Sequence, residues 1–229
     1  MLSNIYFISN VVNWIANLLA LTVAILYCFR SFNPAYLRIF PLYLFVSIGI
    51  EAMVNPFINK FFDFEPFAGH QPYIMNIFYN LFTPFELFIF SYFLFQVVRS
   101  LRIKKILLVL ICLFSIFFVQ YSLQKDLGAF SNIAVALESI IIIIPCLTYF
   151  RELFTRTEPV DLLREPSFWL VTGIFFYLAT IFPLYMTRSY LIAHGLIGVS
   201  KSLSSINNFA LSITYLLFIR SYTCRIKKS

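Results

Sequence analysis

Charged residues are scarce in this chain. They make up 12% of its 229 residues, whereas hydrophobic residues make up 61% and phenylalanine alone appears 29 times. Soluble domains average about 25% charged and roughly 45–50% apolar residues. A soluble fold cannot bury so much apolar surface, so the composition excludes an ordinary soluble domain and predicts a protein whose solvent is lipid. At this length, about seven spans of ~20–25 residues use most of the chain as a single domain.

Histidine and cysteine are also few, and their positions argue against most metal, haem and disulfide chemistry. Both histidines, His70 and His194, fall in expected loops, and the four cysteines form no CxxC pair. We therefore expect no cofactor, no disulfide framework and no metal site within the membrane. A surface metal site built from Asp63, Glu65 and His70 is an alternative, although an exposed loop histidine is the simpler interpretation. No HExxH, GxSxG or glycine-rich phosphate loop is present, so we expect no enzyme activity.

Seven stretches are long and apolar enough to cross a bilayer. We expect an all-α polytopic membrane protein with helices at residues 5–29, 37–57, 72–98, 106–121, 131–150, 167–186 and 202–219. The fourth stretch is apolar nearly all round, which is typical of a peripheral, lipid-facing helix. No internal repeat separates the chain into halves.

Lysine and arginine gather on one side of this expected topology. Thirteen of the 17 lie in the loops after the first, third and fifth spans and in the tail, and the other side holds Lys60, Lys125, Arg188 and Lys201. The positive-inside rule then places the N-terminus outside and the C-terminus in the cytoplasm. The opening segment carries no positive charge, so we expect a first span rather than a cleavable signal peptide. Orientation and contact with lipid headgroups account for the net charge of +7, and nucleic acid is not an expected partner.

Three carboxylates lie inside the expected spans: Glu51, Glu86 and Glu138. No lysine or arginine within a span is available to pair with them. A carboxyl group at membrane depth costs about 2.5–3.5 kcal/mol on insertion scales, so it normally faces protein or trapped water and marks a functional site.

Most of the polar residues within the spans fall on the same side of the membrane when the spans alternate in direction. One economical arrangement is a helix bundle with a polar cavity open to the extracytoplasmic side. The candidate pocket residues are Asn13, Glu51, Asn55, Asn76, Asn80, Glu86, Glu138, Asn207 and Asn208. For the amides the alternative is hydrogen bonding between helices, worth about 0.6 kcal/mol each.

Two aromatic-rich stretches carry a family resemblance. Residues 79–86, YNLFTPFE, are followed by an aromatic run, and residues 166–169, PSFW, are followed by Gly173 and Tyr177. Together with Glu51, they resemble the seven-helix sensory membrane modules found ahead of kinase or other output domains in Bacteroidetes-type bacterial sensor proteins. The resemblance implies an envelope-facing sensory or accessory protein without catalytic residues. This sequence carries no output domain, so we expect any signal to pass through another protein.

The sequence thus favours a non-enzymatic, receptor-like or accessory protein of the bacterial inner membrane. Its pocket would bind a small ligand, a lipid or a partner helix, and its partners would be membrane lipid and a membrane or cytoplasmic output protein. A small proton-coupled solute transporter is an alternative, because membrane carboxylates suit proton coupling and Pro84, Pro145 and Pro183 interrupt expected helices. A structural subunit of a larger membrane complex is another. An intramembrane enzyme acting on lipid ranks last, because no nucleophile–base pair accompanies the carboxylates.

Overall fold

The computed structural model describes residues 2–28, 34–54, 71–124, 131–156 and 161–224, and all regular structure among them is helical. The long helices are α1 (Leu2–Cys28), α2 (Phe40–Val54), α4 (Gln71–Val97), α5 (Leu101–Gln124), α6 (Asn132–Phe154), α7 (Pro166–Ala193) and α8 (Ile197–Thr223). Short 3-10 helices, η1 (Ala35–Ile39) and η2 (Leu162–Arg164), precede α2 and α7. The all-α prediction is confirmed for this part of the chain.

Seven of these segments are long and apolar enough to span a membrane. Six are single long helices, and the seventh runs from η1 into α2 over Ala35–Met53. The prediction of a multi-pass membrane protein with seven helical spans is therefore confirmed.

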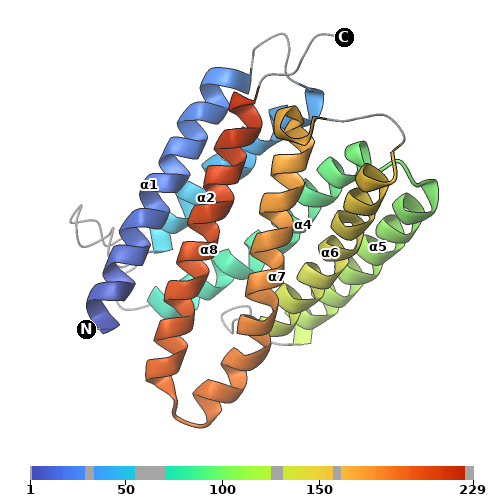
Figure 1. Cartoon of the computed structure of the whole chain (residues 1–229). Coiled ribbons are helices and arrows are strands. Elements are labelled where there is room, and N and C mark those ends of the chain that lie inside the picture. The colour runs from blue at the N-terminus through green and yellow to red at the C-terminus, as the bar shows by residue number, and fades with distance from the viewer. Residues whose placement is uncertain (1, 29–33, 55–70, 125–130, 157–160, 225–229) are drawn as a thin grey trace.

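Six helices close into a ring. Around it, α1 packs against α2, α2 against α4, α4 against α6, α6 against α7, α7 against α8, and α8 against α1 again (Figure 1). Helix α5 lies outside the ring, against α6 and α4. Only 11% of the residues in its most apolar stretch are buried, the smallest share among the seven spans. The prediction that the fourth span is peripheral is confirmed.

Helix α5 begins at Leu101, within the segment that the sequence assigned to a basic connector. The carboxylate of Glu152, near the end of α6, accepts hydrogen bonds from the backbone amides of Arg99 at 2.7 Å and Ser100 at 2.8 Å. A negative charge with acceptor oxygens just ahead of a helix stabilises its first turn. The predicted start at residue 106 was therefore wrong, and the basic residues of 102–105 lie on the helix.

Helices α7 and α8 also extend beyond their predicted ends. The loop expected at residues 187–201 is mostly helical, since α7 continues to Ala193 and α8 starts at Ile197. The chain reverses at Gly195, whose φ of 71° lies in the left-handed region that glycine adopts without steric cost.

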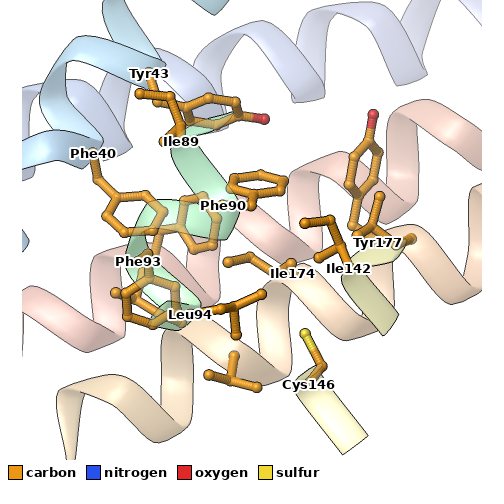
Figure 2. Close-up of a cluster of buried hydrophobic side chains, with 14 of the residues drawn as sticks. Phe40, Tyr43, Ile89, Phe90, Phe93, Leu94, Ile142, Cys146, Ile174 and Tyr177 are labelled. Atoms are coloured by element: carbon orange, nitrogen blue, oxygen red, sulfur yellow. The ribbon is translucent and has the colours of Figure 1, made fainter. Parts of the chain in front are cut away.

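An aromatic cluster fills the ring at the end where α4 and α8 finish. The ring of Phe40 in α2 lies 5.2 Å from that of Phe93 in α4 and 5.3 Å from that of Phe218 in α8, both edge to face. All three side chains are fully buried. Figure 2 shows Tyr43 and Tyr177 at the border of this cluster, with their hydroxyl groups on the side away from the rest of the core. The cluster joins α2, α4 and α8 at this end of the ring.

Helices α7 and α8 approach each other closely at Gly173. A Cβ atom built there would lie 3.1 Å from Cε1 of Phe218 and 3.4 Å from Cβ of Leu217. The hydroxyl of Thr214 donates to the Gly173 carbonyl at 3.3 Å, across the same contact. Membrane helices associate through such small-residue contacts, because lipid supplies no hydrophobic force between them.

We predict that Gly173→Val lowers the stability of the purified protein in detergent. Overpacking of this kind costs about 1–3 kcal/mol, or roughly 2–10 °C in the midpoint of thermal unfolding. Gly49→Val is the matched control, because a Cβ at Gly49 in α2 has no heavy atom within 4 Å. Equal midpoints for the two variants would contradict the close contact between α7 and α8.

Candidate functional site

A cavity of about 270 Å³ lies inside the ring. It receives side chains from all six ring helices and none from α5. Most of the lining residues come from the first halves of α1, α4, α6 and α8 and from the last half of α2, so the cavity lies towards the end of the bundle where α1 begins. Its volume is close to the lower limit of about 300 Å³ for small-molecule sites.

Seven of the nine residues predicted for the pocket line this one cavity: Asn13, Glu51, Asn76, Glu86, Glu138, Asn207 and Asn208. Asn55 lies outside the described residues, as do Asp63, Glu65 and His70 of the alternative metal site. The three carboxylates, which come from α2, α4 and α6, therefore share a single space.

Asn80 does not line the cavity, and its placement in the pocket was wrong. It is 3% exposed, and its side-chain oxygen accepts a hydrogen bond from the backbone amide of Ser131 at 3.1 Å. Ser131 is the N-cap of α6, and its own hydroxyl accepts from the amide of Ala134. Asn80 thus ties α4 to the start of α6, which is the interhelical role that the sequence left open for the amides.

Glu86 in α4 and Glu138 in α6 both line the cavity and are both almost fully buried. The hydroxyl of Tyr43 donates to Oε1 of Glu86 at 2.8 Å, and Glu86 is 4% exposed. Glu138 is 2% exposed and lies close enough to Glu86 for their charges to interact. Among the described residues, Oε1 of Glu138 has no hydrogen-bond partner. Of this pair, Glu86 is held by a tyrosine hydroxyl, whereas one oxygen of Glu138 is left unpaired in the described structure.

Glu51 is held by α1. The side-chain amide of Asn13 donates to its Oε1 at 3.0 Å. Its Oε2 is buried without a partner in the described part of the chain, and the same is true of the side-chain oxygen of Asn13. One turn deeper, Asn17 donates to the hydroxyl of Ser47 at 3.3 Å, linking α1 and α2 a second time.

The helix α2 presents its polar groups at every fourth residue, so they share one face. Tyr43 reaches Glu86 in α4, Ser47 is hydrogen-bonded to the hydroxyl of Tyr215 in α8 at 3.2 Å, and Glu51 reaches α1. This single row connects α2 to three helices of the ring and forms one wall of the cavity.

Asn208 closes the ring between α8 and α1. Its side-chain amide donates to the side-chain oxygen of Asn10 at 3.1 Å and to the hydroxyl of Ser9 at 3.3 Å. Asn207 also lines the cavity, and its side-chain oxygen is buried without a partner among the described residues.

Sequence reasoning missed the aromatic share of the lining. Six tyrosines contribute to it: Tyr6, Tyr43, Tyr79, Tyr177, Tyr185 and Tyr215. Tyr43 is the most consequential omission, because it holds Glu86. Its spacing of four and eight residues from Ser47 and Glu51 is the signal that would have found it.

The cavity is rich in hydrogen-bond acceptors and poor in cations. Its described lining contains three glutamates and no lysine, arginine or histidine. Four buried oxygens on lining residues have no partner in the described structure: those of Asn13, Glu51, Glu138 and Asn207. Buried polar atoms are normally hydrogen-bonded, so a set of unpaired acceptors around one space points to binding.

Lys104, at the start of α5, and Arg220, near the end of α8, lie at the other end of the bundle, each beside an aromatic ring. The ammonium of Lys104 lies 5.0 Å from the ring centroid of Phe95, and the guanidinium of Arg220 lies 5.6 Å from that of Trp169. Beyond the last span, burial raises the pKa of the Cys224 thiol to about 11, although Arg220 opposes the shift. A thiol with that pKa reacts slowly at neutral pH.

Comparison with protein-family models, with curated proteins and with solved structures found no match. The resemblance to sensory membrane modules therefore stays a prediction.

We predict that Tyr43→Phe and Glu86→Ala are energetically coupled in unfolding. Interhelical hydrogen bonds in membranes contribute about 0.6 kcal/mol and reach roughly 1.7 kcal/mol, so a double-mutant cycle on thermal or denaturant unfolding should yield a coupling in this range. Tyr149→Phe with Glu86→Ala is the control pair, because the Tyr149 hydroxyl is bonded to Ser167 instead. A coupling of zero for the first pair would contradict the placement of Glu86.

Proposed function

We propose that this chain is a non-enzymatic, receptor-like or accessory protein of the bacterial inner membrane. Its cavity binds a small ligand, a lipid or a partner helix on the extracytoplasmic side, and the bound state acts through another protein. The observation that carries the proposal is the convergence of Glu51, Glu86 and Glu138 on one cavity with no basic side chain in its described lining.

Burying a carboxyl group raises the free energy of a membrane protein, and an apolar side chain would fill the same space without that penalty. Hydrophobic packing stabilises a bundle without unpaired acceptors, so three carboxyl groups around one cavity favour a binding role over a structural one. The alternative of hydrogen bonding between helices explains Asn80, whose partner is the backbone of α6. It does not explain Glu138, whose Oε1 has no partner among the described residues.

The buried aromatic cluster next to the cavity favours binding over transport. Phe40, Phe90 and Phe93 are fully buried immediately beyond Tyr43, which borders both the cluster and the cavity. A transporter must open its site to each side in turn, and this cluster would have to separate for that to happen. We therefore place a one-sided receptor ahead of a proton-coupled carrier.

Transmission to a partner requires two arrangements of the bundle that differ in affinity for the ligand. The ring supplies a physical route, since Glu51, Ser47 and Tyr43 of α2 touch three neighbouring helices. A ligand that competes for these bonds would shift α2 relative to α1, α4 and α8. The basic end of the bundle is where a cytoplasmic partner would sense that shift.

We predict that wild-type protein purified in mild detergent carries a small molecule, a lipid or a partner helix that Glu51→Gln, Glu86→Gln and Glu138→Gln reduce. Hydrogen bonds to charged groups contribute about 1.5–3 kcal/mol, so each loss should lower retention roughly tenfold or more. Mass spectrometry of the purified material measures retention. Asp161→Asn is the control, because that exposed carboxylate pairs with Arg164 far from the cavity. Unchanged retention in all three glutamine variants would refute the proposed function.

We predict that the cavity is reached from outside the cell. In a protein whose native cysteines are replaced by serine, Asn207→Cys should react in spheroplasts with a membrane-impermeant methanethiosulfonate reagent, because Asn207 lines the cavity. Ser91→Cys is the control, since Ser91 is 3% exposed within the ring and does not line the cavity. Reaction at Asn207→Cys only in inverted vesicles would show that the predicted orientation is reversed.

A further inference from the structure

We infer that the ligand of this cavity is a small organic cation that carries N–H groups: a primary or secondary amine in its protonated form. The inference rests on the proposed function and narrows it, because it names the chemistry that the site recognises. Its basis is the charge, the unpaired atoms and the aromatic side chains of the lining, taken in turn below.

The charged groups in the described part of the lining are all carboxyl groups. Glu51, Glu86 and Glu138 all contribute carboxyl groups, and no described lining residue is basic. An anionic ligand would bring a further negative charge into a space of low dielectric, where repulsion between like charges is strong. A cation would be attracted by every ionised carboxylate in the site, so the lining selects against acids and phosphates and in favour of a base.

The unpaired atoms of the lining are all oxygens, which accept hydrogen bonds in an amide or in an ionised carboxylate. Oε1 of Glu138, Oε2 of Glu51 and the side-chain oxygens of Asn13 and Asn207 are buried and have no partner among the described residues. Glu138 is 2% exposed and Asn13 3% exposed, so both side chains lie inside the bundle. An ammonium group offers up to three N–H donors and no acceptor, which complements such a set. A quaternary ammonium has no N–H and would leave the same oxygens unpaired.

The remaining lining favours an organic cation over a metal ion. Tyr43, Tyr177 and Tyr215 come from three different helices and line the same cavity as the carboxyl groups. Aromatic faces attract organic cations, by about 0.5–1 kcal/mol at exposed sites and ~2 kcal/mol when water is excluded. In the part of the chain that the structure describes, no three His, Cys, Asp or Glu side chains are grouped closely enough to hold a metal ion. The aromatic lining is thus the feature that favours a ligand with a carbon frame.

A protonated amine can reach this cavity from two sources. It can be a soluble amine, or it can be the ethanolamine headgroup of a membrane lipid that enters between helices. Both sources present the same protonated amine. If the ligand is the lipid headgroup, the lipid composition of the bilayer changes the apparent affinity for a soluble amine. If the ligand is a soluble amine, it does not.

The test uses the full chain in phosphatidylcholine nanodiscs and matched probes. 1-Aminobutane and 1,4-diaminobutane should raise the midpoint of thermal unfolding with increasing concentration, and 1-butanol and 1,4-butanediol, which have the same carbon frames, should not. Glu86→Gln and Glu138→Gln should weaken the amine effect by roughly tenfold or more, whereas Asp161→Asn should leave it unchanged. Addition of phosphatidylethanolamine to the nanodiscs distinguishes the two sources. If the amine concentration that gives half of the maximal stabilisation rises, the site is assigned to the lipid headgroup. If that concentration is unchanged, the site is assigned to a soluble amine.

Three results would overturn the inference: no stabilisation by either amine, equal stabilisation by amine and alcohol, or an amine effect that both glutamine variants retain. The comparison of amine with alcohol needs no variant, so it decides even if a substitution prevents folding. A neutral or anionic molecule that copurifies with the wild type and is lost from the glutamine variants would overturn the amine and leave the proposed function standing. Unchanged copurification in every variant would instead remove the proposed function itself.

Discussion

The structure depends on how polar side chains inside the bilayer find partners within the protein. Lipid offers no hydrogen bonds, so an unpaired carboxyl or amide raises the free energy of the bundle. Helix α2 carries one row of polar side chains that find such partners. Tyr43 is hydrogen-bonded to Glu86, Ser47 to Tyr215 and Glu51 to Asn13. These bonds join α2 to α4, α8 and α1. The side chains of this row both connect the helices of the ring and line its cavity. The packing of α2 against its neighbours therefore also shapes the cavity.

The ring divides along its axis into a polar part and an apolar part. At one end Phe40 packs edge to face against Phe93 and Phe218, and all three side chains are fully buried. At the other end the lining combines carboxyl groups, amides and tyrosine hydroxyls around about 270 Å³. Tyr43 belongs to both, with its ring in the aromatic cluster and its hydroxyl on Glu86. This asymmetry supports the one-sided binding site that we propose.

Some polar side chains of the bundle have hydrogen-bond partners on neighbouring helices and others have unpaired oxygens. This difference separates residues that hold the bundle together from candidate binding residues. Asn80 and Asn208 have partners across helix boundaries, and their bonds hold α4 to α6 and α8 to α1. Glu138 and Asn207 line the cavity with oxygens that no described residue pairs. A protein keeps such groups at a cost in stability when they serve recognition, and their common acceptor character restricts what they can recognise.

The sequence by itself determined that this is an all-helical membrane protein with seven spans, that the fourth span is peripheral, and that most of its polar residues face one end of the bundle. These properties follow from composition and from the periodicity of each segment, which are local. Only the tertiary structure decided the order of helices around the ring, the separation of Asn80 from the cavity and the part played by Tyr43. Periodicity specifies which face of a helix is polar but not which neighbour that face meets, because seven apolar helices are nearly interchangeable in lipid. Contacts such as that of Gly173 with Phe218, and hydrogen bonds between residues far apart in the chain, select one arrangement from the many that the pattern allows.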